Sequence, residues 1–136
     1  MKLIFFDTPH NLQSISSHDS VGLSLKLFDQ PLIVWNINLI DKINKIDTIL
    51  IPEKYSETYL IVKERFPTIQ VNYSPTKPAH LSEAMQIVTK KSDFSKLDQM
   101  ELNLNSIVYQ LKETQEIIID TIQYPWGYLK VIKNIL

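Results

Sequence analysis

The chain has no cysteine and only two glycines, Gly22 and Gly127, among its 136 residues. The absence of cysteine excludes disulfides, thiolate catalysis and metal sites with sulfur ligands, and it favours an intracellular protein. We therefore expect a cytoplasmic location. Glycine normally lets backbone amides approach a phosphate, so any phosphate-binding loop in this chain must work without that residue.

The chain also lacks an excess of charge of either sign. Fourteen lysines and arginines stand against 15 aspartates and glutamates, for a net charge of -1. Such a protein has no overall field to attract nucleic acid or an anionic membrane, so we predict neither as a partner. No apolar run approaches the ~18 residues of a membrane-spanning helix, and the run before Asp7 is too short for a signal peptide.

What the chain does contain is the composition of one globular domain, which we assign to residues 1–136. Hydrophobic residues make up 44% and charged residues 21% of the sequence. Both values are ordinary for a soluble domain of this length, which needs no second core. No internal repeat or linker divides the chain.

Three short apolar runs predict strands. Leu3–Phe6 is continuously apolar, as in a strand buried on both faces, and Thr48–Ile51 has the same character. Residues 68–73 alternate between apolar and polar side chains, which indicates a third strand. Helices of sufficient length separate these runs, so we expect the strands to pair in parallel.

Four segments have the pattern of helices. Pro31 suits a helix start, and apolar residues follow it at helical spacing up to Ile43, after a turn at Asp29 and Gln30. Residues 53–66 and 80–90 predict two more helices, and Pro125 opens the last one. The order predicts an α/β fold of the three-layer Rossmann-like type, a mostly parallel sheet with helices on both faces.

The segment between residues 97 and 123 is less regular. Residues 97–112 fit either one helix, or a short strand at 102–104 followed by a helix at 106–112, whereas residues 115–123 predict a strand. The final helix carries Trp126, Leu129, Ile132 and Leu136 on its apolar side, with further apolar residues outside that stripe. We interpret Trp35 and Trp126 as core or interface residues, and we predict a homodimer through the C-terminal helix.

The candidate site follows the first strand. Residues 7–21 are polar, and ligands of parallel sheets bind beyond the carboxyl ends of the strands. His18 and Asp19 could join Asp7 and His10 around a metal ion, but their spacing favours a solvated loop, and adjacent residues Ser17, His18 and Asp19 rarely form a catalytic triad. Lys26 is the basic residue closest to this segment, with a solvent-facing strand position as its alternative reading.

Two stretches suggest a family: PLIVWNINLIDKINKIDTILI at residues 31–51 and YPWGYLKVIKNIL at residues 124–136. Together they resemble the sugar-phosphate nucleotidyltransferases, also called NDP-sugar pyrophosphorylases. The resemblance implies a fold that binds a nucleotide or sugar phosphate, with magnesium as the cofactor of an active enzyme. The ligand-binding residues it implies lie after the first strand and near the helix start: Phe6, Asp7, Thr8, His10, Asn11 and Lys26.

The family's catalytic motifs are replaced in this chain. Its Gly-Gly-x-Gly-Thr-Arg loop is matched by residues 7–12, its Pro-Lys pair by Val21 and Gly22, and its Gly-Thr-Ala segment by residues 77–79. Nucleotidyl transfer depends on cationic stabilisation of the phosphates, so these losses predict reduced or no catalysis. The resemblance therefore implies a shortened, degenerate member that binds its ligand. The alternative is a non-catalytic structural or interaction protein, as a homodimer or as the partner of a full-length enzyme.

Overall fold

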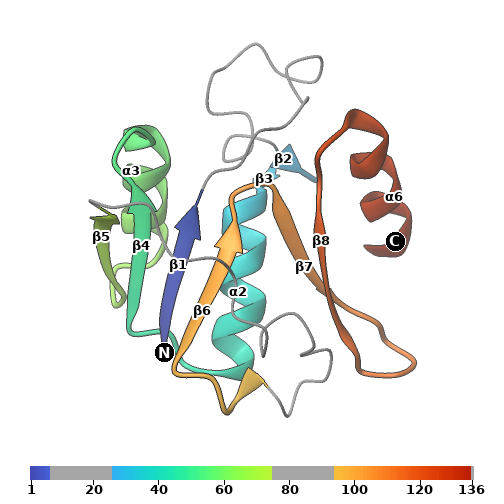
Figure 1. Cartoon of the computed structure of the whole chain (residues 1–136), viewed down its shortest axis with the longest axis horizontal. Helices are drawn as coiled ribbons and strands as arrows, with labels where there is room; N and C mark the ends of the chain where they lie inside the picture. The colour runs from blue at the N-terminus through green and yellow to red at the C-terminus, as the bar shows by residue number, and fades with distance from the viewer. Residues whose placement is uncertain (7–25, 75–93, 136) are drawn as a thin grey trace.

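The computed structural model describes residues 1–6, 26–74 and 94–135 (Figure 1). The predicted helix at 80–90 and the polar segment at 7–21 lie outside these ranges. The strands are β1 (Lys2–Phe6), β2 (Lys26–Leu27), β3 (Gln30–Pro31), β4 (Thr48–Pro52), β5 (Gln70–Ser74), β6 (Gln99–Asn103), β7 (Ser106–Gln110) and β8 (Ile117–Thr121). The helices are α2 (Leu32–Ile43), α3 (Ser56–Arg65) and α6 (Pro125–Ile135).

A four-stranded parallel sheet forms the centre of the fold, in the order β5-β4-β1-β6. Lys2 pairs with Thr48 of β4 on one side and with Gln99 of β6 on the other. The prediction of three parallel strands is confirmed, because β1, β4 and β5 are adjacent and parallel. The molecule is thus an α/β protein with a mostly parallel sheet and additional antiparallel strand pairs.

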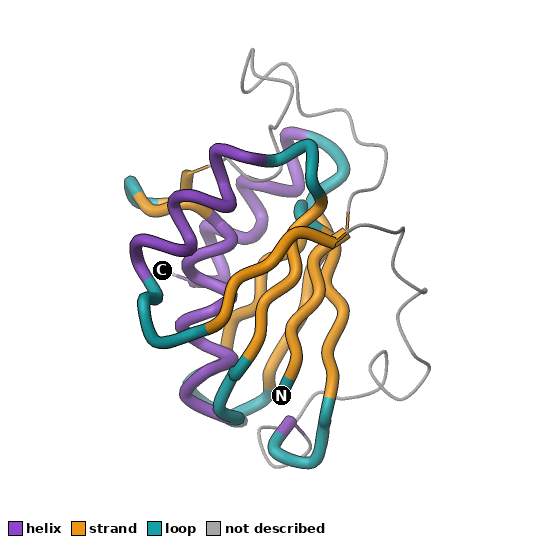
Figure 2. Tube along the Cα trace, turned by 90° about the vertical axis from the view of Figure 1, so that its left-hand side faces the viewer, coloured by secondary structure: helices purple, strands orange, loops and turns teal. Residues whose placement is uncertain are grey.

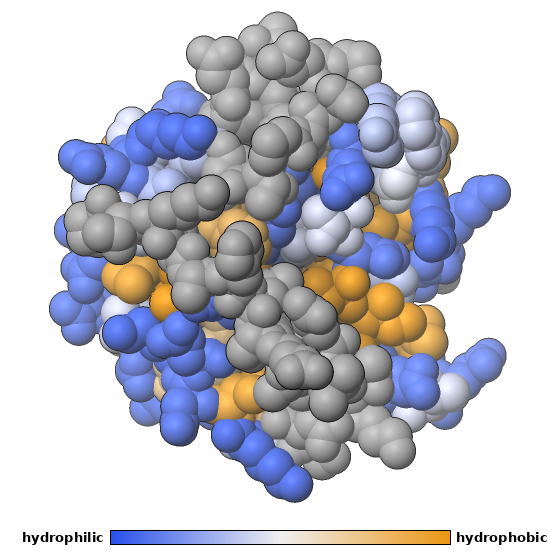
Figure 3. Space-filling view, in the orientation of Figure 1, coloured by the Kyte–Doolittle hydropathy of each residue, from blue (hydrophilic) through white to orange (hydrophobic). Residues whose placement is uncertain are grey.

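The described helices lie on one face of this sheet (Figure 2). Strand residues that point toward them, such as Leu3 and Phe5, are fully buried and pack with Ile37 of α2. Each such side chain contributes about 1.5–3 kcal/mol relative to an exposed one. The strand residues between them point to the other face, where Ile4 is 8% exposed and Leu50 is half-buried. Figure 3 views the molecule from that side and shows hydrophobic residues in patches among hydrophilic ones.

The prediction of a helix between residues 97 and 112 is wrong. The structure has strands β6 and β7 there, joined by a turn at Leu104 and Asn105. Apolar residues occur often enough in this segment to imitate a helical stripe. However, Ile107 packs into one core while Val108 packs into another, so alternate side chains bury opposite faces, as strand residues do. Tertiary burial on both sides therefore decides the structure.

A second, smaller core lies between β7, β8, α6 and the β2–β3 hairpin. It contains Leu27, Ile107, Tyr109 and Val131. The hairpin turn falls at Phe28 and Asp29, one residue earlier than predicted, and both residues have positive φ (53° and 63°), as in type I′ turns. The Tyr109 hydroxyl donates to Asp120 Oδ2 at 2.9 Å; burial and this carboxylate raise the pKa of Tyr109.

Helix α6 begins at Pro125 as predicted but buries a different face. Val131 is 1% exposed and faces the second core, whereas Trp126 is 67% and Leu129 is 61% exposed. The prediction that Trp126 and Leu129 lie on a stripe that faces the core is therefore wrong. The exposure of Trp126 leaves this residue available for an interface. Trp126 instead stacks on Tyr124, with ring centroids 4.5 Å apart. Within the described ranges, no helix is both long enough and apolar enough to cross a membrane.

Candidate functional site

The order of the strands in the parallel sheet reverses at one point. From β1 the chain continues to β4 and then β5 on one side, whereas β6 lies on the other side. Ligands of open parallel sheets bind outside the carboxyl ends of the strands at such a reversal of strand order. Here the reversal falls between β1 and β6, where Phe6 pairs with Asn103 and the backbone N–H of Leu104 donates to the Phe6 carbonyl at 2.8 Å.

Glu101 is a buried acid within β6. It pairs with Ile4 of β1, and its side chain lies on the sheet face away from the helices. The residue is only 7% exposed. Gln99 Nε2 donates to its Oε1 at 3.0 Å, whereas its Oε2 has no hydrogen-bond partner in the described part of the chain. A buried carboxylate oxygen without a donor is costly, which makes it a site where a ligand donor would be favourable.

Asn105 is a second buried polar residue, two positions beyond the end of β6. Its backbone is fixed from both directions, because its N–H donates to Asn103 Oδ1 and its carbonyl accepts from the Ile122 N–H, each at 3.0 Å. The side chain is fully buried, yet neither its nitrogen nor its oxygen has a hydrogen-bond partner among the described residues. The amide therefore offers a donor and an acceptor at a fixed position.

The chemistry of this cluster, Glu101, Asn103 and Asn105, suits neutral polar groups. A hydroxyl can donate to the free carboxylate oxygen and also exchange hydrogen bonds with an amide. A phosphate would be repelled by the same carboxylate. Oxygen atoms of these side chains could also contact a divalent cation, but no group of three or more histidine, aspartate or glutamate side chains that could hold a metal ion occurs in the described ranges.

The sequence-predicted site residues are only partly within the described structure. Phe6 ends β1 beside Asn103, at the expected edge of the sheet. Asp7, Thr8, His10 and Asn11 lie outside the described residues. Lys26 does not join the parallel sheet: it pairs with Pro31 in the β2–β3 hairpin, and its carbonyl accepts a hydrogen bond from the Tyr128 hydroxyl of α6.

Sequence reasoning missed Glu101, Asn103 and Asn105. Reading residues 97–112 as largely helical concealed them, because a helix would distribute these side chains around its surface. The signal was present in the alternation Glu-Leu-Asn-Leu-Asn at residues 101–105, a period of two that is typical of a strand; in the structure the strand ends at Asn103 and Asn105 lies in the following turn.

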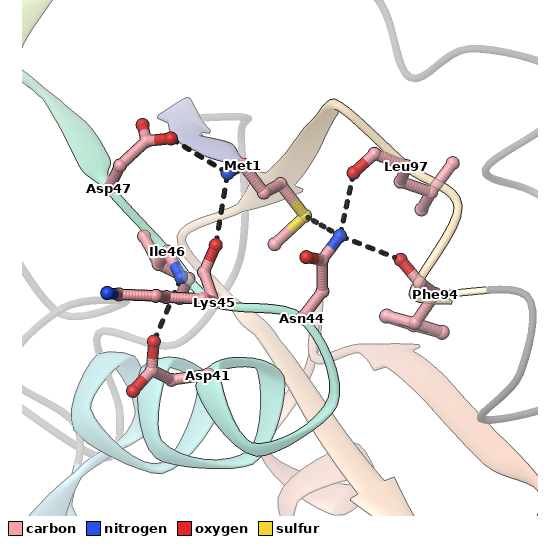
Figure 4. Close-up of polar contacts among 8 residues, drawn as sticks. All are labelled: Met1, Asp41, Asn44, Lys45, Ile46, Asp47, Phe94 and Leu97. Carbon is pink, nitrogen blue, oxygen red and sulfur yellow. Dashed lines mark hydrogen bonds and ion pairs between the residues drawn. The ribbon is translucent and has the colours of Figure 1, made fainter.

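The opposite edge of the sheet carries as many polar groups, but they are paired (Figure 4). The Met1 ammonium donates to the Lys45 carbonyl at 3.0 Å and to Asp47 Oδ2 at 2.9 Å. Asn44 Nδ2 donates to the carbonyls of Phe94 and Leu97, at 3.1 and 2.7 Å. The hydrogen bond from the Met1 ammonium, followed by one involving Thr48, lowers the pKa of Asp47. These hydrogen bonds join the N-terminus to residues 45 and 47 and the end of α2 to residues 94 and 97.

No family model, curated protein or solved structure matches the chain.

Proposed function

We propose that the chain binds a nucleotide or sugar phosphate at the carboxyl ends of β1 and β6, through the hydroxyl groups of the sugar. One observation carries this proposal: Glu101, in the middle of β6, and Asn105, two residues beyond its end, keep buried side-chain atoms that have no hydrogen-bond partner among the described residues, and β6 borders the reversal of strand order. Buried polar atoms in native proteins are nearly always paired, so unpaired ones at a place where ligands bind favour a ligand as the missing partner.

The charge of Glu101 determines the orientation of the ligand in this proposal. Its carboxylate accepts hydrogen bonds from sugar hydroxyls, and the phosphate points away from it. The residues that the resemblance implies as ligands, Asp7, Thr8, His10 and Asn11, follow Phe6 directly in the chain and supply the remaining contacts. Lys26 is proposed only as a charge near the rim, because its strand belongs to the separate hairpin.

We further propose that catalysis is reduced or absent and that the chain is a degenerate nucleotidyltransferase-like protein. The cluster at β6 has one carboxylate and two amides, whereas nucleotidyl transfer requires cations against the phosphates. Magnesium belongs to this proposal only for an active enzyme. A three-layer Rossmann-like arrangement with helices on both faces of the sheet is also proposed; the low exposure of Ile4 on the face away from α2 supports it.

Calorimetric titration tests the binding proposal. Nucleoside triphosphates, sugar 1-phosphates and the corresponding free sugars are titrated into the wild-type chain and into Asn105→Ala, with and without magnesium. We expect saturable heat with the wild type and about tenfold or weaker binding by the variant, because a buried hydrogen-bonded amide is lost. Asn38→Ala, an exposed asparagine of α2, is the matched control. Absence of heat with every ligand contradicts the proposal, and a pyrophosphate-release assay tests catalysis separately.

The second candidate is an interaction protein that forms a homodimer through α6. The supporting observation is the exposure of Trp126 and Leu129 at neighbouring turns of the helix, beside the half-exposed Tyr124. Large exposed apolar side chains that cluster are typical of interfaces. Light scattering at micromolar concentration tests this candidate: a dimer that dissociates in Trp126→Ala/Leu129→Ala supports it, and a monomeric wild type contradicts it.

A further inference from the structure

A groove of about 780 Å³ lies between α2 and β7 and shares no residue with the cluster at Glu101. The helix contributes Trp35, Asn38, Leu39 and Lys42, which are spaced three and four residues apart and so form one face of α2. Trp35 is half-buried, and its indole N–H donates to the Leu27 carbonyl at 2.8 Å, which fixes the ring at the groove wall.

The strand side of the groove is also fixed in place. It is formed by Val108, Tyr109 and Gln110, with Lys112 just beyond the end of β7. The Tyr109 hydroxyl donates to Asp120 and accepts from Asn134 Nδ2 at 3.0 Å, so this ring is held by β8 and α6 together. Both walls are thus rigid secondary structure, which lowers the entropic cost of binding a ligand.

The groove lining combines apolar and aromatic side chains with neutral polar ones and two lysines: Trp35, Leu39, Val108 and Tyr109, then Gln30, Asn38 and Gln110, then Lys42 and Lys112. Helix α2 and strand β7 run in the same direction, from the carboxyl edge of the parallel sheet toward its amino edge (Figure 1). Lys42 lies in the last turn of α2 and Lys112 lies two residues beyond β7, so both lysines belong to the part of the groove toward the amino edge of the sheet. Among the described residues, the lining contains no carboxylate and neither lysine forms an ion pair.

From this arrangement we infer that the groove binds an amphipathic organic anion, with an apolar body against Trp35 and Leu39 and a carboxylate or phosphate head between Lys42 and Lys112. The volume lies in the range of small-molecule sites, roughly 300–1,000 Å³. Two lysines that have no ion pair among the described residues and lie toward one end of the groove match a single anionic head, whereas a neutral lipid or alcohol would leave them without a partner. The inference does not depend on the proposed nucleotide or sugar-phosphate site.

Tryptophan fluorescence measures this binding directly once the second indole is removed. In a Trp126→Phe background, Trp35 is the remaining tryptophan. Decanoate and decyl phosphate serve as the probes, below their micellar concentrations, with decanol as the neutral probe and acetate and inorganic phosphate as heads without a body. We expect saturable changes with the two amphipathic anions, and weaker or undetectable binding of the other three. The ratio of the affinities for decanoate and decyl phosphate shows which anionic head group the groove prefers.

Charge variants separate the anion site from general apolar binding. Lys42→Gln/Lys112→Gln should weaken decanoate or decyl phosphate about five- to tenfold and leave decanol unchanged, because each partly exposed charge contributes modestly. Lys2→Gln/Lys96→Gln removes the same charge outside the groove and should have no effect. Decanol binding as tightly as decanoate, equal weakening in both double variants, or no saturable signal with either anion would overturn the inference. Each of the single variants Lys42→Gln and Lys112→Gln should lower the affinity for these anions about two- to threefold. The single variants therefore test the inference even if the double variant does not fold.

Discussion

Asn36 and Asn105 are the same residue type with the same complete burial, and they differ in what their amides contact. Asn36, in α2, donates to the Ser106 carbonyl and accepts from the Val108 N–H, both at 2.8 Å, so its side chain acts as a partner for the open edge of β7. Asn105, one residue before β7 begins, has neither bond within the described ranges. Burial alone therefore does not distinguish a structural amide from a candidate ligand-binding one, whereas hydrogen-bond pairing does.

The same contrast separates the two edges of the parallel sheet. At the amino edge, Asn44, Asp47 and the Met1 ammonium are joined to neighbouring loops (Figure 4). At the carboxyl edge, the Asn105 amide has no partner among the described residues, and Glu101, two residues before the end of β6, keeps one carboxylate oxygen without a partner there. Proteins tolerate unpaired buried groups mainly where function requires them, so stability and function are expected to lie at opposite edges of this sheet.

The largest effect should come from removing the paired amide. Asn36→Ala leaves the Ser106 carbonyl and the Val108 N–H without partners in a buried place, and we expect it to lower the free energy of unfolding by about 3 kcal/mol. Urea denaturation followed by circular dichroism measures this. Asn38→Ala, on the exposed face of the same helix, should change stability little. If both variants lose the same amount, the bridging role of Asn36 is refuted.

Glu101→Gln should change the free energy of unfolding in the opposite direction to Asn36→Ala. The substitution keeps the shape of a buried side chain and removes a charge whose second oxygen has no donor, so we expect the free energy of unfolding to rise by about 1 kcal/mol. Binding of the proposed sugar ligand should weaken in the same variant, since an amide nitrogen replaces one acceptor. Glu57→Gln, exposed in the first turn of α3, serves as the control. A loss of stability in Glu101→Gln would mean that the carboxylate is already well paired.

Sequence patterns predicted the parallel sheet well because its signals are local. Short apolar runs at residues 3–6 and 49–51, separated by a helix that follows Pro31, indicate strands that alternate with helices. The turn at Phe28 was misplaced by one residue because phenylalanine rarely adopts a positive φ, so its residue type gives no sign that it takes this turn position.

The site could not be predicted to the same extent, because it depends on pairing between distant segments. Nothing local shows that Asn36 bonds to Val108, 72 residues later, while Asn105 bonds to nothing through its side chain within the described ranges. The helix expected at residues 106–112 failed for the same reason: the second core, which decides that Ile107 and Val108 bury opposite faces, is assembled from β8, α6 and the β2–β3 hairpin. Packing against segments that are distant in the sequence overrides a weak local pattern of apolar residues.

Asn105→Ala tests the unpaired amide and should change stability less than Asn36→Ala. Because no hydrogen bond of the described residues is lost from the side chain, the expected change in the free energy of unfolding is within about 1 kcal/mol in either direction. The backbone bond to Asn103 Oδ1 is retained in this variant. The measurement is the same urea titration. A loss as large as that of Asn36→Ala would show that Asn105 is a structural residue and would remove the strongest support for the carboxyl edge as a site.

The smallest change in stability is expected from the exposed contact between Asp47 and the Met1 ammonium at the amino edge. Hydrogen bonding to the Met1 ammonium lowers the pKa of Asp47 from its ordinary value of 3.8. A carboxyl whose folded-state pKa lies below its unfolded value stabilises the protein above the unfolded pKa, and this contribution is lost as the pH falls through the folded pKa. Asp47→Asn should therefore lower Tm slightly at pH 7 and not at pH 2.5, compared by differential scanning calorimetry. Because solvent screens this exposed pair, a large decrease at pH 7, or one that persists in acid, would show that Asp47 acts through packing and not through charge.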